Sequence, residues 1–271
     1  MVKRLLTSAV GIILLTVVLF LDKWVLTAVV SVLSMCAAYE LLYSTKIVRS
    51  KLLLALAILM AGLAPLWAHF GCSPAIGLGA VLLCVVLSFC AGMDKAERIR
   101  FDAICAVFFA AIIIPLFFSC IIMLYLPVNG LFYLLLVLII SWGCDTFAML
   151  SGMIFGKTKL IAHISPKKTV QGSIGGVIGA VGLAAVFIAV SNHYFIDPDV
   201  QYLPVLLMAF FGSMLGQIGD LTMSFIKREH NLKDFGKIFP GHGGILDRFD
   251  SVLFVAPLVQ VVIFIVQQFR G

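Results

Sequence analysis

The sequence has 271 residues, of which 62% are hydrophobic and only 12% are charged, and its mean hydropathy is +1.16. This composition excludes an ordinary soluble domain, because a chain of this length cannot hide so much apolar surface from water. The net charge of +6 suits an anionic membrane surface or anionic substrates, whereas the absence of any RNA or DNA motif argues against nucleic-acid binding.

Apolar segments recur along the chain at the length that a bilayer requires. A hydrocarbon core of about 30 Å takes roughly 20 helical residues, so we predict an all-α polytopic membrane protein with about nine transmembrane helices. In chain order, the predicted spans are 5–21, 24–43, 52–69, 75–92, 103–126, 131–154, 173–191, 203–225 and 250–268. Lys3 and Arg4 precede the first span, which lacks a small-residue cleavage site and is therefore expected to be a retained anchor.

The basic residues predict the orientation of these spans. All but two of the 19 Lys and Arg residues fall on one side of an alternating nine-span arrangement, and the exceptions are Lys23 and Arg270. Cytoplasmic loops carry the excess of positive charge. The amino terminus and the cation-rich loops are therefore expected to be cytoplasmic, with the carboxyl terminus on the opposite side.

The two halves of the predicted single domain, residues 1–271, differ in chemistry. Residues 1–130 form an apolar helical scaffold, in which Glu40 is expected at the membrane interface rather than in a functional site. Residues 131–271 contain two longer predicted cytoplasmic loops, 155–172 and 226–249, which concentrate charge, Gly and Pro. Functional residues are expected in this second half.

Asp145 and Asp220 lie inside predicted membrane spans. A carboxylate in a membrane helix costs a few kcal/mol, so such residues normally face a polar cavity and a partner. Helical spacing places Gln217, Asp220, Ser224 and Lys227 on one stripe that leads from the membrane to the loop 226–249. The alternative is that each aspartate only pairs with a basic side chain during assembly.

The loop 226–249 combines carboxylates, cations and glycines. Asp247 and Asp250 are hard oxygen ligands suited to Mg²⁺. Its cations could neutralise phosphoryl oxygens, and its glycines allow backbone amides to approach them. These residues are Lys227, Arg228, Lys233 and Arg248, with Gly241, Gly243 and Gly244. Three histidines, His163, His230 and His242, lack a zinc spacing, and we assign no zinc.

The loop 155–172 contains the segment Ser165-Pro166-Lys167-Lys168-Thr169. Its paired lysines could bind a triphosphate as point charges. Alone this is a weak signal, because basic residues are expected on any cytoplasmic loop.

Together these segments resemble the phosphatidate cytidylyltransferases, also called CDP-diacylglycerol synthases. The first resembling segment starts at Asp145-Thr146-Phe147-Ala148 and ends at Gly172; the second reads Ser224-x-x-Lys227-Arg228-x₄-Lys233-Asp234-x-Gly236-x₃-Pro240-Gly241-His242-Gly243-Gly244-x-x-Asp247-Arg248-x-Asp250. The resemblance covers roughly residues 140–251. Gln171 stands where the family pattern has a glutamate, and Gly216 where a small hydroxyl residue is common.

The resemblance implies that the protein joins CTP and phosphatidic acid to give CDP-diacylglycerol and pyrophosphate at the surface of membrane lipids. It implies one or two Mg²⁺ ions, with Asp220 and Asp247 as principal ligands and Asp145 and Asp250 in support. The implied catalytic residues also include Lys227, Arg228, Lys233, Asp234, His242 and Arg248. The implied substrate-binding residues are Ser165, Lys167, Lys168, Thr169, Ser224, Gly243 and Gly244.

Two other functions fit parts of the same pattern. An ion-coupled anion transporter could use Asp145 and Asp220 as intramembrane ion sites, although the inverted repeats that it predicts are not visible in the sequence. Another CTP-dependent lipid phosphotransferase, such as a polyprenol kinase, would need similar groups. The sequence leaves the oligomeric state open between a monomer and a homodimer.

Overall fold

The structure is a computed structural model that describes residues 11, 13–93, 99–127, 129–194, 201–239 and 243–270. Within these residues, eight helical segments are long and apolar enough to cross a membrane, which confirms the all-α polytopic fold. They coincide with the last eight predicted spans. Of the first predicted span, residues 13–20 are helical, while residues 5–10 and 12 lie outside the described residues.

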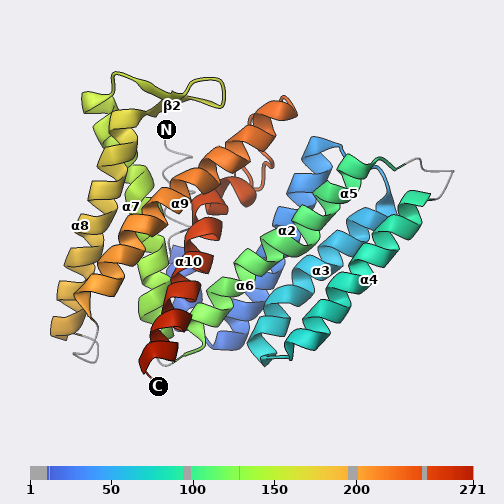
Figure 1. Ribbon diagram of the computed structural model, residues 1–271, viewed down its shortest axis with the longest axis horizontal. Helices are drawn as coiled ribbons and strands as arrows, with labels where there is room; N and C mark the ends of the chain where they lie inside the picture. Colours follow the sequence, from blue (N-terminus) through green and yellow to red (C-terminus); the bar gives the residue numbers. More distant parts are fainter. Residues whose placement is uncertain are drawn as a thin grey trace. The chain divides into compact units, whose positions relative to one another are not determined.

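The helices and strands follow one another in the order labelled in Figure 1. They are α2 (Lys23–Thr45), α3 (Lys51–Phe70), α4 (Pro74–Met93), α5 (Phe101–Phe108), the π-helix η1 (Phe109–Ile113), α6 (Ile114–Tyr125), α7 (Gly130–Phe155), β1 (Lys159–Ile161), β2 (Ser165–Thr169), α8 (Val170–Tyr194), α9 (Tyr202–Glu229) and α10 (Leu246–Arg270). The helices α5, η1 and α6 form one continuous span, Phe101–Tyr125.

Contacts divide the chain into two compact units. The first unit contains residues 1–126 and 230–248, and the second contains residues 127–229 and 249–271. The segment 230–248, which the sequence assigns to the chemical half, thus packs within the first unit. The sequence predicts a single domain over residues 1–271, and this stays a prediction.

In the first unit, α3 packs against α2, α4 and α6 (Figure 1). Large apolar side chains fill the space between these helices, and Leu42, Leu53, Ile114 and Phe118 are fully buried. Because lipid covers the outer surfaces, these internal contacts rather than water exclusion specify how the helices pack.

In the second unit, α8 packs closely on α7 through small residues. A Cβ atom added at Gly172 would lie 2.7 Å from the carbonyl oxygen of Ala148 and 3.2 Å from Cα of Gly152. Such approaches between helix backbones require glycine. The close packing of α7 and α8 fixes the two helix ends between which the polar hairpin β1–β2 is formed, with Lys159 opposite Thr169.

Both long loops are shorter than predicted from the sequence. The helix α9 continues to Glu229, so Lys227 and Arg228 are helical, and α10 begins at Leu246, so Asp247 and Arg248 lie in its first turn. The first loop contains the hairpin and ends at Thr169, since α8 begins at Val170. A fall in hydropathy marks where lipid contact ends, but a helix continues until its backbone groups are capped or interrupted.

Candidate active site

A cavity of about 570 Å³ opens in the second unit between α7, the hairpin, α8 and α9. Two aspartates from the membrane helices, Asp145 and Asp220, line it together with three lysines of the hairpin, Lys159, Lys167 and Lys168. A cavity that combines intramembrane carboxylates with cations from a surface hairpin can hold an anionic group at the membrane boundary. Both aspartates line this cavity, and their role in a functional site stays a prediction.

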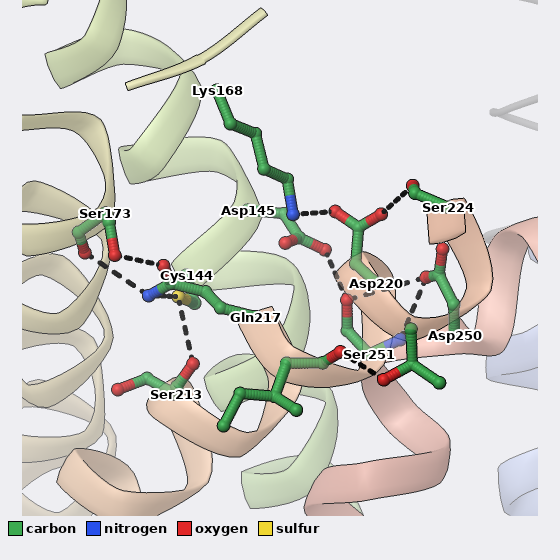
Figure 2. Close-up of polar contacts among 12 residues, drawn as sticks. Cys144, Asp145, Lys168, Ser173, Ser213, Gln217, Asp220, Ser224, Asp250 and Ser251 are labelled. Carbon is green, nitrogen blue, oxygen red and sulfur yellow. Dashed lines mark hydrogen bonds and ion pairs between the residues drawn. The ribbon is translucent and has the colours of Figure 1, made fainter. Parts of the chain in front are cut away.

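The centre of this cavity contains an ion pair between the hairpin and α9. The ammonium of Lys168, on β2, contacts Oδ2 of Asp220, and the two side chains are 26% and 23% exposed. The other carboxylate oxygen of Asp220 accepts a hydrogen bond from Oγ of Ser224, 3.3 Å away and one turn along α9 (Figure 2). Asp220 is thus held in one orientation by a cation and a hydroxyl group.

A second network connects Asp145 with α10 through Ser251. Oγ of Ser251 donates to Oδ2 of Asp145 at 3.1 Å, and its backbone N–H donates to Oδ1 of Asp250 at 2.8 Å. Ser251 is only 2% exposed. Figure 2 shows Ser251 between these carboxylates, with Asp220 on the adjacent helix.

Asp145, Asp220 and Asp250 belong to one electrostatic environment. Asp250 is 9% exposed and lies close enough to Asp220 and Asp145 to experience repulsion from both. Lys227 opposes this repulsion from the last turn of α9. Within the part of the chain that the structure describes, no three His, Cys, Asp or Glu side chains have the geometry of a metal-binding group.

Gln217 lines the cavity and bonds to two neighbouring helices. Its Nε2 donates to the carbonyl oxygen of Ser173 at 3.2 Å and to Sγ of Cys144 at 3.3 Å, and its Oε1 accepts from the Ser173 hydroxyl (Figure 2). These bonds join α7, α8 and α9. Of the predicted stripe on α9, Gln217 and Asp220 line the cavity and Ser224 donates to Asp220, whereas Lys227 is not in the lining.

Other predicted residues of the second unit shape the hairpin. Thr169 lines the cavity, and its Oγ1 accepts from the N–H of Gly172 at 3.1 Å in the first turn of α8. Nε of Arg228 donates to the carbonyl oxygen of Ile164 at 3.2 Å, which ties the hairpin to α9. Ser165 begins β2 but does not line the cavity.

Gln171, the departure from the family pattern, has a structural role. Its Oε1 accepts from the backbone N–H groups of Lys157 and Thr158 at 3.1 and 3.3 Å, and its Nε2 donates to Oγ1 of Thr158 at 2.8 Å. A glutamate could accept the same two backbone bonds. The amide therefore keeps the connection between α7 and β1.

In the first unit, Asp247 closes the turn that precedes α10. Its Oδ2 accepts from the N–H groups of Phe235 at 2.8 Å and Gly244 at 3.0 Å, and the side chain is 8% exposed. Gly243 has a φ of +87°, and a Cβ there would lie 2.8 Å from the same oxygen. The two predicted glycines thus permit this turn by their backbone conformation and by their lack of side chains.

The remaining predicted residues are not placed at the cavity. Lys233, Asp234 and Arg248 are exposed residues of the first unit, and His242 lies outside the described residues. The structure thus brings together Asp145, Lys167, Lys168, Thr169, Ser224 and Asp220 around the cavity, with Asp250 and Lys227 beside them. Ser251 and Ser173 were missed, because an isolated serine in an apolar helix gives no signal of its partner.

Comparison with known proteins shows the family of this chain. The sequence profile of the cytidylyltransferase family matches residues 2–266. The chain belongs to the cytidylyltransferase family. A phosphatidate cytidylyltransferase of Bacillus subtilis (strain 168) is 34% identical over 263 residues, which cover 96% of both chains. Enzymes of the same name from Staphylococcus haemolyticus and Staphylococcus aureus are 42% identical over 135 residues, half of each chain.

The match to the Bacillus subtilis enzyme covers both halves of this cytidylyltransferase family member, the apolar half and the half that contains the cavity. The first half, which resembles the family only in its hydropathy when the sequence is read alone, is therefore related by descent. The individual roles of the site residues stay predictions.

Proposed function

We propose that this chain transfers the cytidylyl group of CTP to phosphatidic acid, forming CDP-diacylglycerol and pyrophosphate. The observation that carries the proposal is the cavity in which Lys168 pairs with the intramembrane Asp220 beside Lys167 and Asp145. It offers phosphate-binding cations next to the ends of membrane-spanning helices, where the phosphate of a lipid is expected. The family membership and the names of the relatives supply the substrates.

The reaction needs positioning and charge neutralisation more than proton transfer. A phosphatidate oxygen forms a bond to the α-phosphorus of CTP while the bond from that phosphorus to the bridging oxygen of pyrophosphate breaks. The second pKa of a phosphate monoester is about 6, so the attacking group is already anionic near neutral pH. This agrees with a site built from aspartates and lysines.

Lys167 and Lys168 are proposed to hold the nucleotide phosphates. Both line the cavity, and Lys167 is exposed, so it can reach an incoming triphosphate. Lys168 is oriented by Asp220, and in exchange its charge reduces the repulsion between Asp220 and the substrate. Arg228 contributes by fixing the hairpin that bears both lysines.

The carboxylates of the second unit suit Mg²⁺, which prefers hard oxygen ligands and retains water and substrate phosphates. Asp145 and Asp220 line the cavity, and Asp250 shares their electrostatic environment. We propose that Asp145 and Asp220, which line the cavity, would hold one or two ions together with substrate phosphates and water, and that the charge of the ions would stabilise the phosphoryl oxygens. The two amides on Oδ2 of Asp247 support a role for that residue in holding the turn 235–247.

The orientation follows from the charges. We assign the hairpin, the turn 230–245 and the amino terminus to the cytoplasm and the carboxyl terminus to the opposite side, because all but two of the 19 Lys and Arg residues then face the cytoplasm. This orientation would give the cavity access to cytoplasmic CTP.

The test is an assay of the purified chain in neutral detergent with labelled CTP, Mg²⁺ and either phosphatidic acid or a polyprenol. We expect a labelled liponucleotide and released pyrophosphate with phosphatidic acid only. Lys168→Ala should lose most of this product, whereas Lys157→Ala, which removes an exposed cation that does not line the cavity, should not. A phosphorylated polyprenol, or solute transport without CTP consumption, would refute the proposal.

A further inference from the structure

A second cavity, of about 550 Å³, lies in the first unit where α2 ends and where α3 and α5 begin. It shares no lining residue with the cavity of the candidate active site. All three helix ends belong to membrane spans. The second cavity therefore opens at the level where apolar spans give way to water, which is also the level of lipid phosphate groups.

The charge of the second cavity is positive. Lys46, Arg49 and Arg100 line it and are exposed, and the described lining residues include no Asp or Glu. Asp102 is the nearest partner of Arg100, with Nη2 and Oδ2 3.1 Å apart, but its side chain is 57% exposed and does not line the cavity. One of the three cations is thus partly neutralised at the solvent side, and the other two have no carboxylate among the described lining residues.

Ser50 is the feature that distinguishes this cavity from an ordinary basic loop. It lines the cavity and is only 5% exposed, yet its hydroxyl has no hydrogen-bond partner among the described residues. It is the N-cap of α3, a position where a serine hydroxyl normally accepts an N–H from the first turn, but here no side-chain cap bond forms. A buried hydroxyl left unpaired costs about 1–3 kcal/mol.

The first turn of α3 adds a second attraction for anions. The initial N–H groups of an α-helix have no partner within the helix, and they carry the positive end of the helix dipole. The α3 helix is 20 residues long, and Leu53 in its first turn lines the cavity together with Ser50. A phosphate oxygen placed there could accept from the Ser50 hydroxyl and from these N–H groups.

We propose that the second cavity binds the phosphate group of an anionic ligand at the membrane surface, separately from the proposed cytidylyl transfer. Arg49 and Lys46 neutralise the charge, Ser50 and the start of α3 donate hydrogen bonds, and the volume of about 550 Å³ admits a phosphate with a small attached group. The phosphate belongs either to a lipid headgroup or to a soluble ion, and both sources present the same oxygens.

The experiment measures binding to the full chain in neutral detergent by native mass spectrometry. One arm titrates short-chain phosphatidylglycerol and the other titrates inorganic phosphate at constant ionic strength. Arg49→Ala and Ser50→Ala should each weaken binding about tenfold, the effect of one lost charge-assisted hydrogen bond. Ser50→Thr, which keeps the hydroxyl, should bind like the parent chain.

Two matched variants control for charge and for a lost hydroxyl. Lys51→Ala removes an exposed cation next to the cavity that does not line it, and Ser34→Ala removes another buried hydroxyl without a described partner in the same unit. Both should bind within about twofold of the parent, because neither side chain lines the cavity and solvent screens the exposed charge of Lys51. Circular dichroism and thermal unfolding verify that each variant is folded. If Ser50→Ala is not folded, the comparison of Ser50→Thr with Arg49→Ala tests the proposal.

Binding in the lipid arm alone identifies a headgroup, and binding in both arms identifies the phosphate group itself as sufficient. The proposal is overturned if neither ligand binds, or if Ser50→Ala binds both ligands as the parent chain does. It is also overturned if Lys51→Ala weakens binding as much as Arg49→Ala, because that result describes a diffuse basic surface. Liponucleotide synthesis, assayed in parallel, reports on the proposed enzymatic function independently of each of these results.

Discussion

Ser251 offers the sharpest test of how the candidate active site is organised. Its hydroxyl donates to Asp145 at 3.1 Å, and its backbone N–H donates to Asp250 at 2.8 Å. Ser251→Ala removes the bond to Asp145 and the longer bond, 3.5 Å, from the same hydroxyl to Oδ1 of Asp250, whereas the backbone N–H bond to Asp250 remains. A hydrogen bond to a charged group contributes about 1.5–3 kcal/mol. Asp145 therefore loses this stabilisation of its side-chain orientation, while the electrostatic repulsion between Asp145 and Asp250 persists.

If Asp145 helps to hold Mg²⁺, this loss should appear in the metal dependence of the reaction. Partners of metal-ligating groups typically change metal affinity by about 10–100-fold when they are removed. We therefore expect the Mg²⁺ concentration for half-maximal liponucleotide synthesis to rise by about tenfold or more for Ser251→Ala. Ser251→Thr keeps the hydroxyl and should restore most of the parent behaviour.

The control is Ser213→Ala, which is the same substitution at a fully buried serine of the same unit. The Ser213 hydroxyl donates to the carbonyl oxygen of Phe210 in its own helix at 2.8 Å and to no carboxylate. It should leave the Mg²⁺ titration unchanged. Equal Mg²⁺ titrations for Ser251→Ala and the parent chain would refute the reasoning, and equal shifts in both variants would show a general packing effect instead.

Three further outcomes are expected. Asp220→Asn should reduce turnover by at least about a hundredfold in a folded protein, since it removes the charge opposite Lys168. The control Asp102→Asn, at an exposed carboxylate of the first unit, should keep parent activity, and steady-state liponucleotide synthesis checks both variants. Lys167→Ala should raise the KM for CTP more than it lowers kcat, because lost ground-state binding appears in KM, and an unchanged KM would contradict this role. Gly172→Ala should destabilise the protein by about 1–3 kcal/mol, because its Cβ would lie 2.7 Å from the carbonyl oxygen of Ala148. At Gly182 a Cβ would have nothing within 4 Å, so the control Gly182→Ala should not lower the thermal unfolding temperature.

Hydropathy predicted the membrane helices well because the bilayer imposes their length. The segment 75–92, for example, corresponds to α4 at Pro74–Met93, and 52–69 corresponds to α3 at Lys51–Phe70. The same measure failed at the ends of α9 and α10, where polar residues such as Arg228 and Asp247 continue or begin a helix. Hydropathy records contact with lipid, whereas helix ends depend on capping, so the two boundaries need not coincide.

The cost of burying a carboxylate in a membrane predicted that Asp145 and Asp220 face a polar cavity. It could not predict their partners, since Ser251 is 106 residues from Asp145 and Lys168 lies on a different element from Asp220. Likewise, only the packing shows that Gly172 and Gly176 of α8 lie against backbone oxygens of α7. Residue type thus predicted which side chains need partners, and the fold determines which partners they have.

The partners of Glu40 also could not be predicted from the sequence. The sequence places it near the end of a span, where an interfacial carboxylate needs no explanation, but it is 4% exposed and accepts from the N–H groups of Ile245 and Leu246 at 3.1 and 3.0 Å. Its negative charge therefore lies at the positive end of α10, where a carboxylate is stabilised by unpaired N–H groups and by the helix dipole. A Cβ at Gly244 would collide with this carboxylate, so the position of Glu40 requires a glycine in the turn. The apolar half of the chain thus contributes a charged group to the turn that carries Asp247, and a contact across more than two hundred residues cannot be inferred from local periodicity.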